Sequence, residues 1–217
     1  MSTWTPKDIQ NEYAFMQDPS RRWDLLCVSA ASSVVRCGTP AHQGKLGHPL
    51  SHLLNSDCLS PITIFNPWDV AGHASRETGL YFWEKYPAGN VPGDNDRAIG
   101  LLQINLNFNA HVTGLEKPAV NLPNGTLILA QFGDELELRQ QVDVTASYWP
   151  RLVRAAYNAG VAGALDGLLN HGGNPDWHTA VGGKKGNPPG DYGQDVLNRA
   201  AAFKLLFESD SGPQSPV

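Results

Sequence analysis

The sequence predicts a mainly helical α+β fold that contains one small, irregular β element. Several segments place apolar residues at helical spacing and end at a glycine, which is typical of α-helices. Residues 98–108, "AIGLLQINLNF", instead alternate apolar and polar side chains, which indicates a short strand or hairpin. With 217 residues, of which 41% are hydrophobic and 17% charged, the chain can bury a core without disulfides or metal ions.

Each predicted helix is marked by residues typical of helix ends. Thr5 and Pro6 stand where an N-cap and a first helical residue belong. Asn66 can cap a helix over residues 67–78, and Gly79 can end it. Together these signals predict helices over residues 5–16, 21–37, 67–78, 124–142, 148–160, 161–172 and 191–209.

Composition divides the chain into three parts. Residues 38–62 are rich in glycine, proline, histidine and serine, as connectors are. We therefore expect an N-terminal helical extension of unknown role over residues 1–60 and a larger domain over residues 61–208. The tail "SDSGPQSPV", residues 209–217, is expected to be disordered.

Charge and hydropathy exclude several classes of protein. The net charge of −5 argues against general binding to nucleic acid, which needs a basic face. A run of 18 apolar residues is absent, so no membrane span is predicted. The first residues, "MSTWTPKDIQNEY", lack the basic and apolar regions of a secretory signal.

The three cysteines are too few for a disulfide scaffold. Cys27 and Cys37 can pair across a short loop, which would leave Cys58 free. Three buried thiols are an equally good interpretation.

Glu77 is an ionisable residue in a segment, "AGHASRETGL", that otherwise looks like a buried helix. His73 lies four residues earlier, so the two side chains share a helix face. The glutamate can serve as a structural ion-pair partner, a metal ligand or a catalytic acid. Metal binding is disfavoured because the second histidine of an HExxH-type site is absent, and we predict no metal ion or cofactor.

Two aspartates, Asp94 and Asp96, follow in a loop rich in glycine and proline, just before the predicted hairpin. A helix end that faces a hairpin across such a loop would form a cleft suited to an extended polysaccharide. Glycoside cleavage uses one carboxylic acid that stays protonated near neutral pH, and often a second carboxylate. The alternative for either aspartate is an ordinary turn residue.

A third polar segment is "RAAYNAGV", in which Tyr157 and Asn158 precede small residues at a predicted helix end. Small residues let a polymer approach the backbone closely, so Tyr157 can hold a sugar or the acid. The alternative is a half-buried tyrosine followed by a helix end with Gly160 in the left-handed conformation.

Taken in order, five segments resemble the goose-type lysozyme family and, more distantly, the soluble lytic transglycosylases. The resemblance covers residues 66–207, about two-thirds of the chain. Each segment is similar to a family motif, from the catalytic-glutamate segment to the final helix. The five segments are "ASRETG", "GDNDRAIGLLQIN", "NGTLILAQF", "AAYNAGV" and "DYGQDVLNRAAAFK".

The resemblance implies a lysozyme-like fold and cleavage of β-1,4 bonds between MurNAc and GlcNAc in peptidoglycan. It places Glu77 on the general acid of the family. Asp94 stands six residues before Gly100, the spacing of a carboxylate that positions or activates water. The resemblance further implies a role in substrate binding or support for Gln103, Tyr157, Asn158 and Tyr192.

One departure bears on the reaction type. The family usually has a second aspartate where this chain has Asn105, and an amide cannot take a proton from water. Asp94 is then the main candidate for the base, with Asp96 as the substitute. Asp94 favours a hydrolase, whereas Asn105 favours a lytic transglycosylase that forms 1,6-anhydro ends.

Two further alternatives use the same scaffold. One is a chitinase, and the other is a glycan-binding or inhibitor module, which the presence of Glu77 disfavours. The expected partner is peptidoglycan or a chitin-type oligosaccharide. We expect a monomer that acts outside the cytoplasm.

Overall fold

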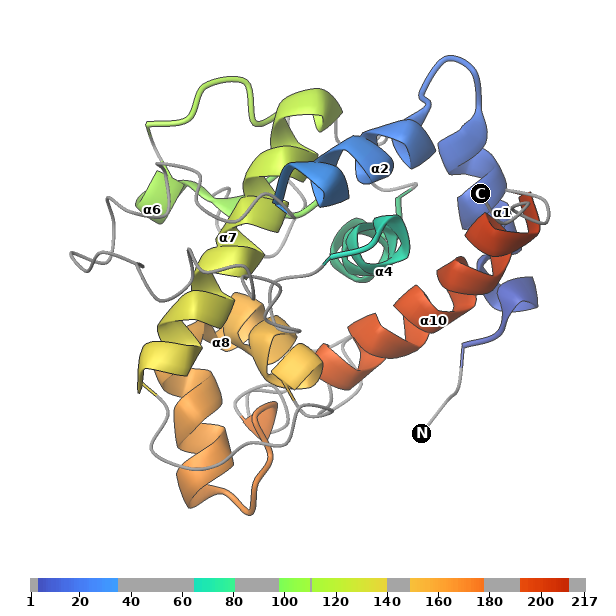
Figure 1. The fold of residues 1–217 in the computed structure, drawn as a ribbon. Coiled ribbons are helices and arrows are strands. Elements are labelled where there is room, and N and C mark those ends of the chain that lie inside the picture. Colours follow the sequence, from blue (N-terminus) through green and yellow to red (C-terminus); the bar gives the residue numbers. More distant parts are fainter. Residues whose placement is uncertain are drawn as a thin grey trace, which may run out of the picture. The chain divides into compact units, whose positions relative to one another are not determined.

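The computed structural model describes residues 4–34, 65–80, 98–109, 111–139, 149–177 and 192–210. These residues form helices and one two-stranded antiparallel sheet, which confirms the mainly helical α+β class (Figure 1). The helices are α1 (Pro6–Gln17), α2 (Trp23–Val34), α4 (Pro67–Thr78), α6 (Leu106–Asn109), α7 (Pro118–Arg139), α8 (Trp149–Asn170) and α10 (Tyr192–Asp210). The strands are β1 (Ala98–Ile99) and β2 (Ile104–Asn105). In these ranges no helix has the length and apolar character that crossing a membrane requires.

Contacts group the described residues into two compact units. The first unit draws its residues from Met1–Ala31, Asn66–Gly125 and Val196–Val217. The second draws them from Ser32–Phe65 and Thr126–Asp195, so α2, α7 and α10 each contribute to both units. The predicted domain limits at residues 60 and 208 stay a prediction.

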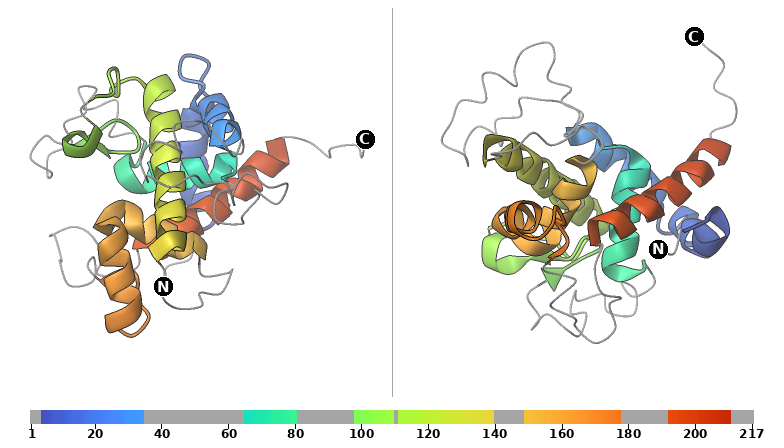
Figure 2. Two further views of the ribbon diagram at one scale, coloured as in Figure 1. Left: turned by 60° about the vertical axis from the view of Figure 1, so that its left-hand side comes forward. Right: turned by 90° about the horizontal axis from the view of Figure 1, so that it is seen from below.

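Helix α4 is the centre of the first unit, where α1, α2 and α10 flank it (Figures 1 and 2). The approach to α10 is close at Gly72, because a Cβ atom there would lie 2.6 Å from the backbone nitrogen of Ala200. Only glycine permits such a contact between two helix backbones. Helix α1 packs its Tyr13 ring against Phe203 and Phe207 of α10.

The ends of α4 lie where the sequence predicts them. Asn66 precedes the helix in an extended conformation, and its backbone N–H donates to the Asp69 carboxylate at 2.9 Å. Gly79 ends the helix in the left-handed conformation, with its N–H donating to the Ser75 carbonyl at 2.8 Å. Since both signals are local in sequence, the pattern alone was sufficient to place the helix.

A polar junction joins α1, α4 and α10 inside the first unit. Nη1 of Arg199 donates to Oγ of Ser75 at 2.7 Å, and the guanidinium lies 3.9 Å from the centre of the Trp4 ring. Glu12 of α1 hydrogen bonds with Ser75 through its carboxyl group. Its Oε2 is buried and has no hydrogen-bond partner among the described residues. Burial therefore raises the pKa of the Glu12 carboxyl, against the weaker effects of Ser75 and Arg199.

Replacing Glu12 with glutamine is expected to stabilise the protein at pH 7 but not at pH 4. A raised pKa in the folded state means that Glu12 favours folding when protonated, below its unfolded pKa. That contribution is lost as the pH rises through the folded pKa, whereas glutamine does not titrate. Removing the buried charge should raise the free energy of unfolding at pH 7 by about 1 kcal/mol or less. Urea denaturation of both proteins at the two pH values measures the difference, and an equal difference at both would contradict the prediction.

Helix α7 begins at Pro118, six residues before the predicted start at residue 124. The prediction was wrong because Asn121 and Pro123 are unfavourable inside helices. Pro123 lies in the second turn, where it removes a single backbone hydrogen bond. Asn124, at the predicted start, is inside the helix, and its Nδ2 donates to the Val120 carbonyl at 2.7 Å.

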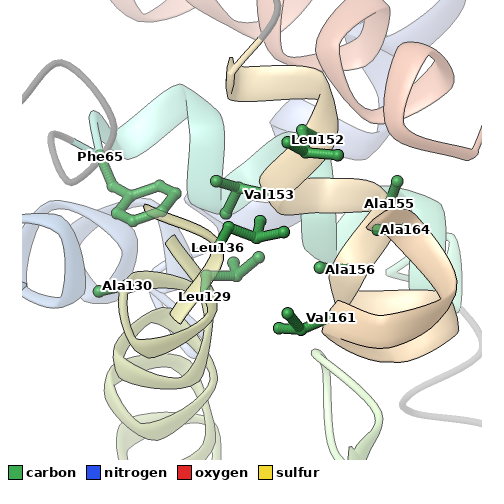
Figure 3. Packing of buried hydrophobic residues seen from close by; sticks show 10 residues of the cluster. All are labelled: Phe65, Leu129, Ala130, Leu136, Leu152, Val153, Ala155, Ala156, Val161 and Ala164. Atoms are coloured by element: carbon green, nitrogen blue, oxygen red, sulfur yellow. The ribbon is translucent and has the colours of Figure 1, made fainter. Parts of the chain in front are cut away.

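The second unit has its core between α7 and α8 (Figure 3). Leu129 and Leu136 of α7 point toward Val153 of α8, and all three are buried. Gly160 has non-helical angles (φ 74°, ψ 161°) and divides α8 into two helical halves. This confirms the two predicted helices that meet at Gly160.

Cys27 is a buried free thiol of α2, and burial raises the pKa of this thiol. The predicted alternative in which Cys27 pairs with Cys37 is therefore not found. Cys37 and Cys58 lie outside the described residues.

Candidate functional site

Glu77 lies in the last turn of α4, and its side chain is only 17% exposed. Its Oε1 is 3.8 Å from Nε2 of His73, one turn earlier on the same face. This separation is within the range of an ion pair but too long for a hydrogen bond. The predicted contact between the two residues is present, and the carboxyl group keeps a partly exposed position from which it can reach a ligand.

Thr78 connects the end of α4 to the hairpin. Its hydroxyl oxygen lies 2.9 Å from the Ala74 carbonyl and 3.4 Å from the carbonyl of Leu101, in the turn between β1 and β2. The residue directly after Glu77 thus touches the hairpin turn. The structure therefore brings the helix end and the β element together within the first unit.

The hairpin turn holds Gln103 in an unusual conformation. Ala98 pairs with Asn105 and Ile99 with Ile104, so Gly100 to Gln103 form the turn. Gln103 has a φ of 45°, in the left-handed region that non-glycine residues seldom adopt. Both its backbone N–H and its side-chain Nε2 donate to the Gly100 carbonyl, at 3.0 and 2.8 Å. Such strained positions cluster at functional sites, where the surrounding structure enforces them.

Asn121 is a residue of this region that the sequence prediction missed. It is fully buried, and its Oδ1 accepts a hydrogen bond from the backbone N–H of Leu102 at 2.8 Å. Its Nδ2 donates to the carbonyls of Ile99 and Leu115, at 2.9 and 3.0 Å. A Cβ atom on Gly100 would lie 1.9 Å from this Nδ2. The only signal in the sequence was an asparagine in a segment that is otherwise apolar.

Asn105, a predicted site residue, lies on β2 and is half-buried. Its Oδ1 accepts a hydrogen bond from the backbone N–H of Asn107 at 2.9 Å. Its carbonyl accepts one from Nδ2 of Asn109 at 3.0 Å. These contacts begin the short helix α6, which the sequence did not predict.

The two predicted loop carboxylates, Asp94 and Asp96, lie outside the described residues. Their distances from Glu77 are therefore not part of the site geometry. Among the residues that are described, no group of three histidine, cysteine, aspartate or glutamate side chains could hold a metal ion.

The remaining predicted site residues belong to the second unit. Tyr157 is half-buried on α8 and packs its ring edge-on against Phe132, with the ring centres 6.3 Å apart. Asn158 is exposed next to it, and Gly160 follows with a φ of 74° and a ψ of 161°, which is not the left-handed helical conformation. Tyr192 is the first residue of α10 and is buried. The half-buried position of Tyr157 agrees with the alternative interpretation of this segment, whereas the left-handed conformation predicted for Gly160 is not found. Asn158 is accessible to a ligand.

A buried ion pair fixes the start of α10 in the second unit. The Asp176 carboxylate accepts from Nε of Arg151 at 3.1 Å and from the backbone N–H of Gly193 at 2.8 Å. Nη2 of Arg151 also donates to Oδ1 of Asn174 at 3.0 Å. Asp176 thus supplies an acceptor to a free N–H of the first helical turn. Asp176 precedes Gly193 by 17 residues in the sequence, and its hydrogen bond fixes the start of the helix that begins with Tyr192.

Replacing Asp176 with asparagine is expected to lower the free energy of unfolding by about 1–3 kcal/mol. The asparagine side chain can still accept a hydrogen bond from the Gly193 N–H. It lacks the negative charge that pairs with the partly buried Arg151. Chemical denaturation measures the loss. Asp166→Asn is the matched control, because its carboxylate is 39% exposed and pairs with His171 at the surface. Equal losses in the two variants would contradict a special role for Asp176.

Comparison with models of known protein families finds no match to this chain. No curated protein sequence is significantly similar to it either. Any assignment of function therefore depends on the motifs and the geometry of the chain itself.

Proposed function

We propose that the chain is a peptidoglycan-cleaving muramidase with a lysozyme-like fold, similar to the goose-type lysozymes. The observation that carries the proposal is the partly exposed Glu77 carboxyl at the end of α4, where the adjacent Thr78 contacts the hairpin turn. A carboxylic acid beside a rigid polar edge suits the protonation of a glycosidic oxygen. The order of the five motifs supports the same function.

In the proposed reaction Glu77 donates its proton to the oxygen that links MurNAc to GlcNAc. The bond between this oxygen and the anomeric carbon breaks through an oxocarbenium-like transition state. Asp94 directs a water molecule at the anomeric carbon and takes its proton, so the water oxygen forms the new bond. Each turnover then leaves Glu77 ionised and Asp94 protonated, and exchange with solvent restores both.

The other candidate residues are assigned to binding. Gln103 presents polar groups from the hairpin turn, and Asn105 lies at the end of the same hairpin. Asn158 and the edge of Tyr157 are proposed to contact sugar, and Tyr192 is proposed to support the site. The substrate is peptidoglycan or a chitin-type oligosaccharide, outside the cytoplasm, and the enzyme acts as a monomer without a metal ion or cofactor.

The products test the proposal. Purified protein is incubated with peptidoglycan, and the released muropeptides are analysed by mass spectrometry. Reducing ends that carry one added water per cleavage are expected. The absence of any cleavage, with binding of chitin oligomers retained, would instead support a glycan-binding module.

A lytic transglycosylase is the second candidate, and Asn105 is the observation that favours it. In an enzyme of that class Glu77 first protonates the leaving oxygen. The ionised Glu77 then takes the proton of a substrate hydroxyl group as that oxygen attacks the anomeric carbon, so no second carboxylate is needed. Products with 1,6-anhydro ends and no added water would replace the hydrolase assignment. Cleavage of chitin oligomers in place of peptidoglycan would indicate the chitinase.

Asp94→Asn is expected to lower the rate of hydrolysis more than Asp96→Asn does. If Asp94 takes the proton from water, asparagine at this position cannot do so. The value of kcat should then fall by about 10²-fold or more. Asp96→Asn should stay within a few-fold of the wild type. Initial rates on the same substrate compare the two variants, and the reverse order would move the base to Asp96.

A further inference from the structure

His73 has a position on α4 that its role in packing does not explain. The side chain is completely buried, and Val70 and Ala74 of the same helix are buried as well. A histidine ring buried in this way costs free energy that an aliphatic side chain would not. Its Nε2 nevertheless lies 3.8 Å from Oε1 of Glu77, within the range of an ion pair. An interaction with the Glu77 carboxyl group would offset part of this cost.

The two partners differ in how firmly they are held. His73 lies in the interior of α4, whose two ends are fixed by the Asp69 hydrogen bond and by Gly79. Its complete burial restricts its rotamers, whereas the 17% exposed Glu77 side chain reaches toward the surface. The imidazole is therefore the fixed partner, and the carboxyl group adjusts to it.

We propose that His73 is a positioning residue that holds Oε1 of Glu77 and leaves Oε2 to carry and deliver the catalytic proton. The inference depends on the proposed function, because it assigns a role relative to the acid. In the state that we infer, Nε2 of His73 carries a hydrogen and donates it toward Oε1. A small rotation of the Glu77 side chain shortens the separation to hydrogen-bond length when substrate binds. The acid proton then belongs to the oxygen that faces the substrate.

Two substitutions separate this role from packing. Gln has an Nε2–H₂ group near the position of the histidine Nε2, whereas Leu fills the buried volume without a donor. His73→Leu is expected to lower kcat by about 10–100-fold with KM changed by less than about 2-fold, because misplacing a catalytic group has effects of this size. His73→Gln should recover most of kcat. Rates are measured on defined peptidoglycan oligosaccharides, with thermal denaturation of each variant as the control for folding.

Three results would overturn the inference. Wild-type kcat in a folded His73→Leu variant would show that Glu77 needs no partner. Equal losses in the Leu and Gln variants would show that the ring serves packing. An increase in KM at constant kcat would show that the residue affects binding alone.

A measurement on the wild-type protein does not depend on activity or on how the Leu variant folds. ¹⁵N NMR of the imidazole, assigned by comparison with His73→Gln, reports which ring nitrogen carries hydrogen. A hydrogen on Nε2 is expected, and a bare Nε2 that accepts a proton from Glu77 would overturn the inference. If Glu77→Gln retains full activity, the proposed function fails. If Glu77→Gln is inactive and His73→Leu matches the wild type, only the present inference fails.

Discussion

Glu77→Gln is expected to abolish cleavage of peptidoglycan, with kcat reduced by about 10³-fold or more. The amide has nearly the same shape as the carboxyl group but cannot transfer a proton to the leaving oxygen, and general acids contribute effects of this size. Since the side chain is partly exposed at the end of α4, the substitution should leave the fold intact. Release of muropeptides measures activity, and circular dichroism with thermal denaturation checks the fold.

The matched control for this experiment is Glu116→Gln. Glu116 is an exposed carboxylate of the same unit, in the segment between the hairpin and α7. Its substitution should leave activity within a few-fold of the wild type. Near-normal activity of Glu77→Gln would refute the assignment of the acid.

Asn121→Ala is expected to lower the free energy of unfolding by about 3–5 kcal/mol. The substitution removes three hydrogen bonds of a fully buried amide. It leaves the Leu102 N–H and the carbonyls of Ile99 and Leu115 without these partners, and it opens a cavity beside Gly100. Because the turn that carries Gln103 is built on these groups, activity per folded molecule should also fall. Chemical denaturation and initial rates measure the two effects.

Asn124→Ala is the control for Asn121→Ala. It removes an amide from the same helix, three residues later, but this side chain is only partly buried and makes a single bond to the Val120 carbonyl. A loss of about 1 kcal/mol or less is expected. Comparable losses at the two positions would mean that Asn121 does not organise the hairpin.

Features that depend on neighbours in sequence were predicted correctly. The limits of α4 follow from Asn66 and Gly79, and the division of α8 follows from Gly160. The hairpin lies within the segment predicted from its alternating pattern, although residues 106–108 of that segment belong to α6. In each case the residues that determine the structure lie within one or two turns of it, so the pattern contains the cause.

Features that depend on distant contacts could not be predicted. Asn121 is unfavourable for a helix considered alone, yet it lies in α7 because its amide completes the hairpin. Asp176 caps α10 from a turn that follows α8, and no spacing rule indicates this. The role of Asp94 stays a prediction, because the loop that contains it is outside the described residues.

The contact between α4 and α10 has a consequence for the synthesis of the protein. Arg199 and Ser75 are 124 residues apart in the chain, and Gly72 meets Ala200 across a similar separation. During translation the helix that carries Glu77 is made well before its neighbour α10. Contacts of such long range form slowly. Helix α4 therefore acquires its contacts with α10 only after α10 has been made, and a product that stops before α10 would lack them.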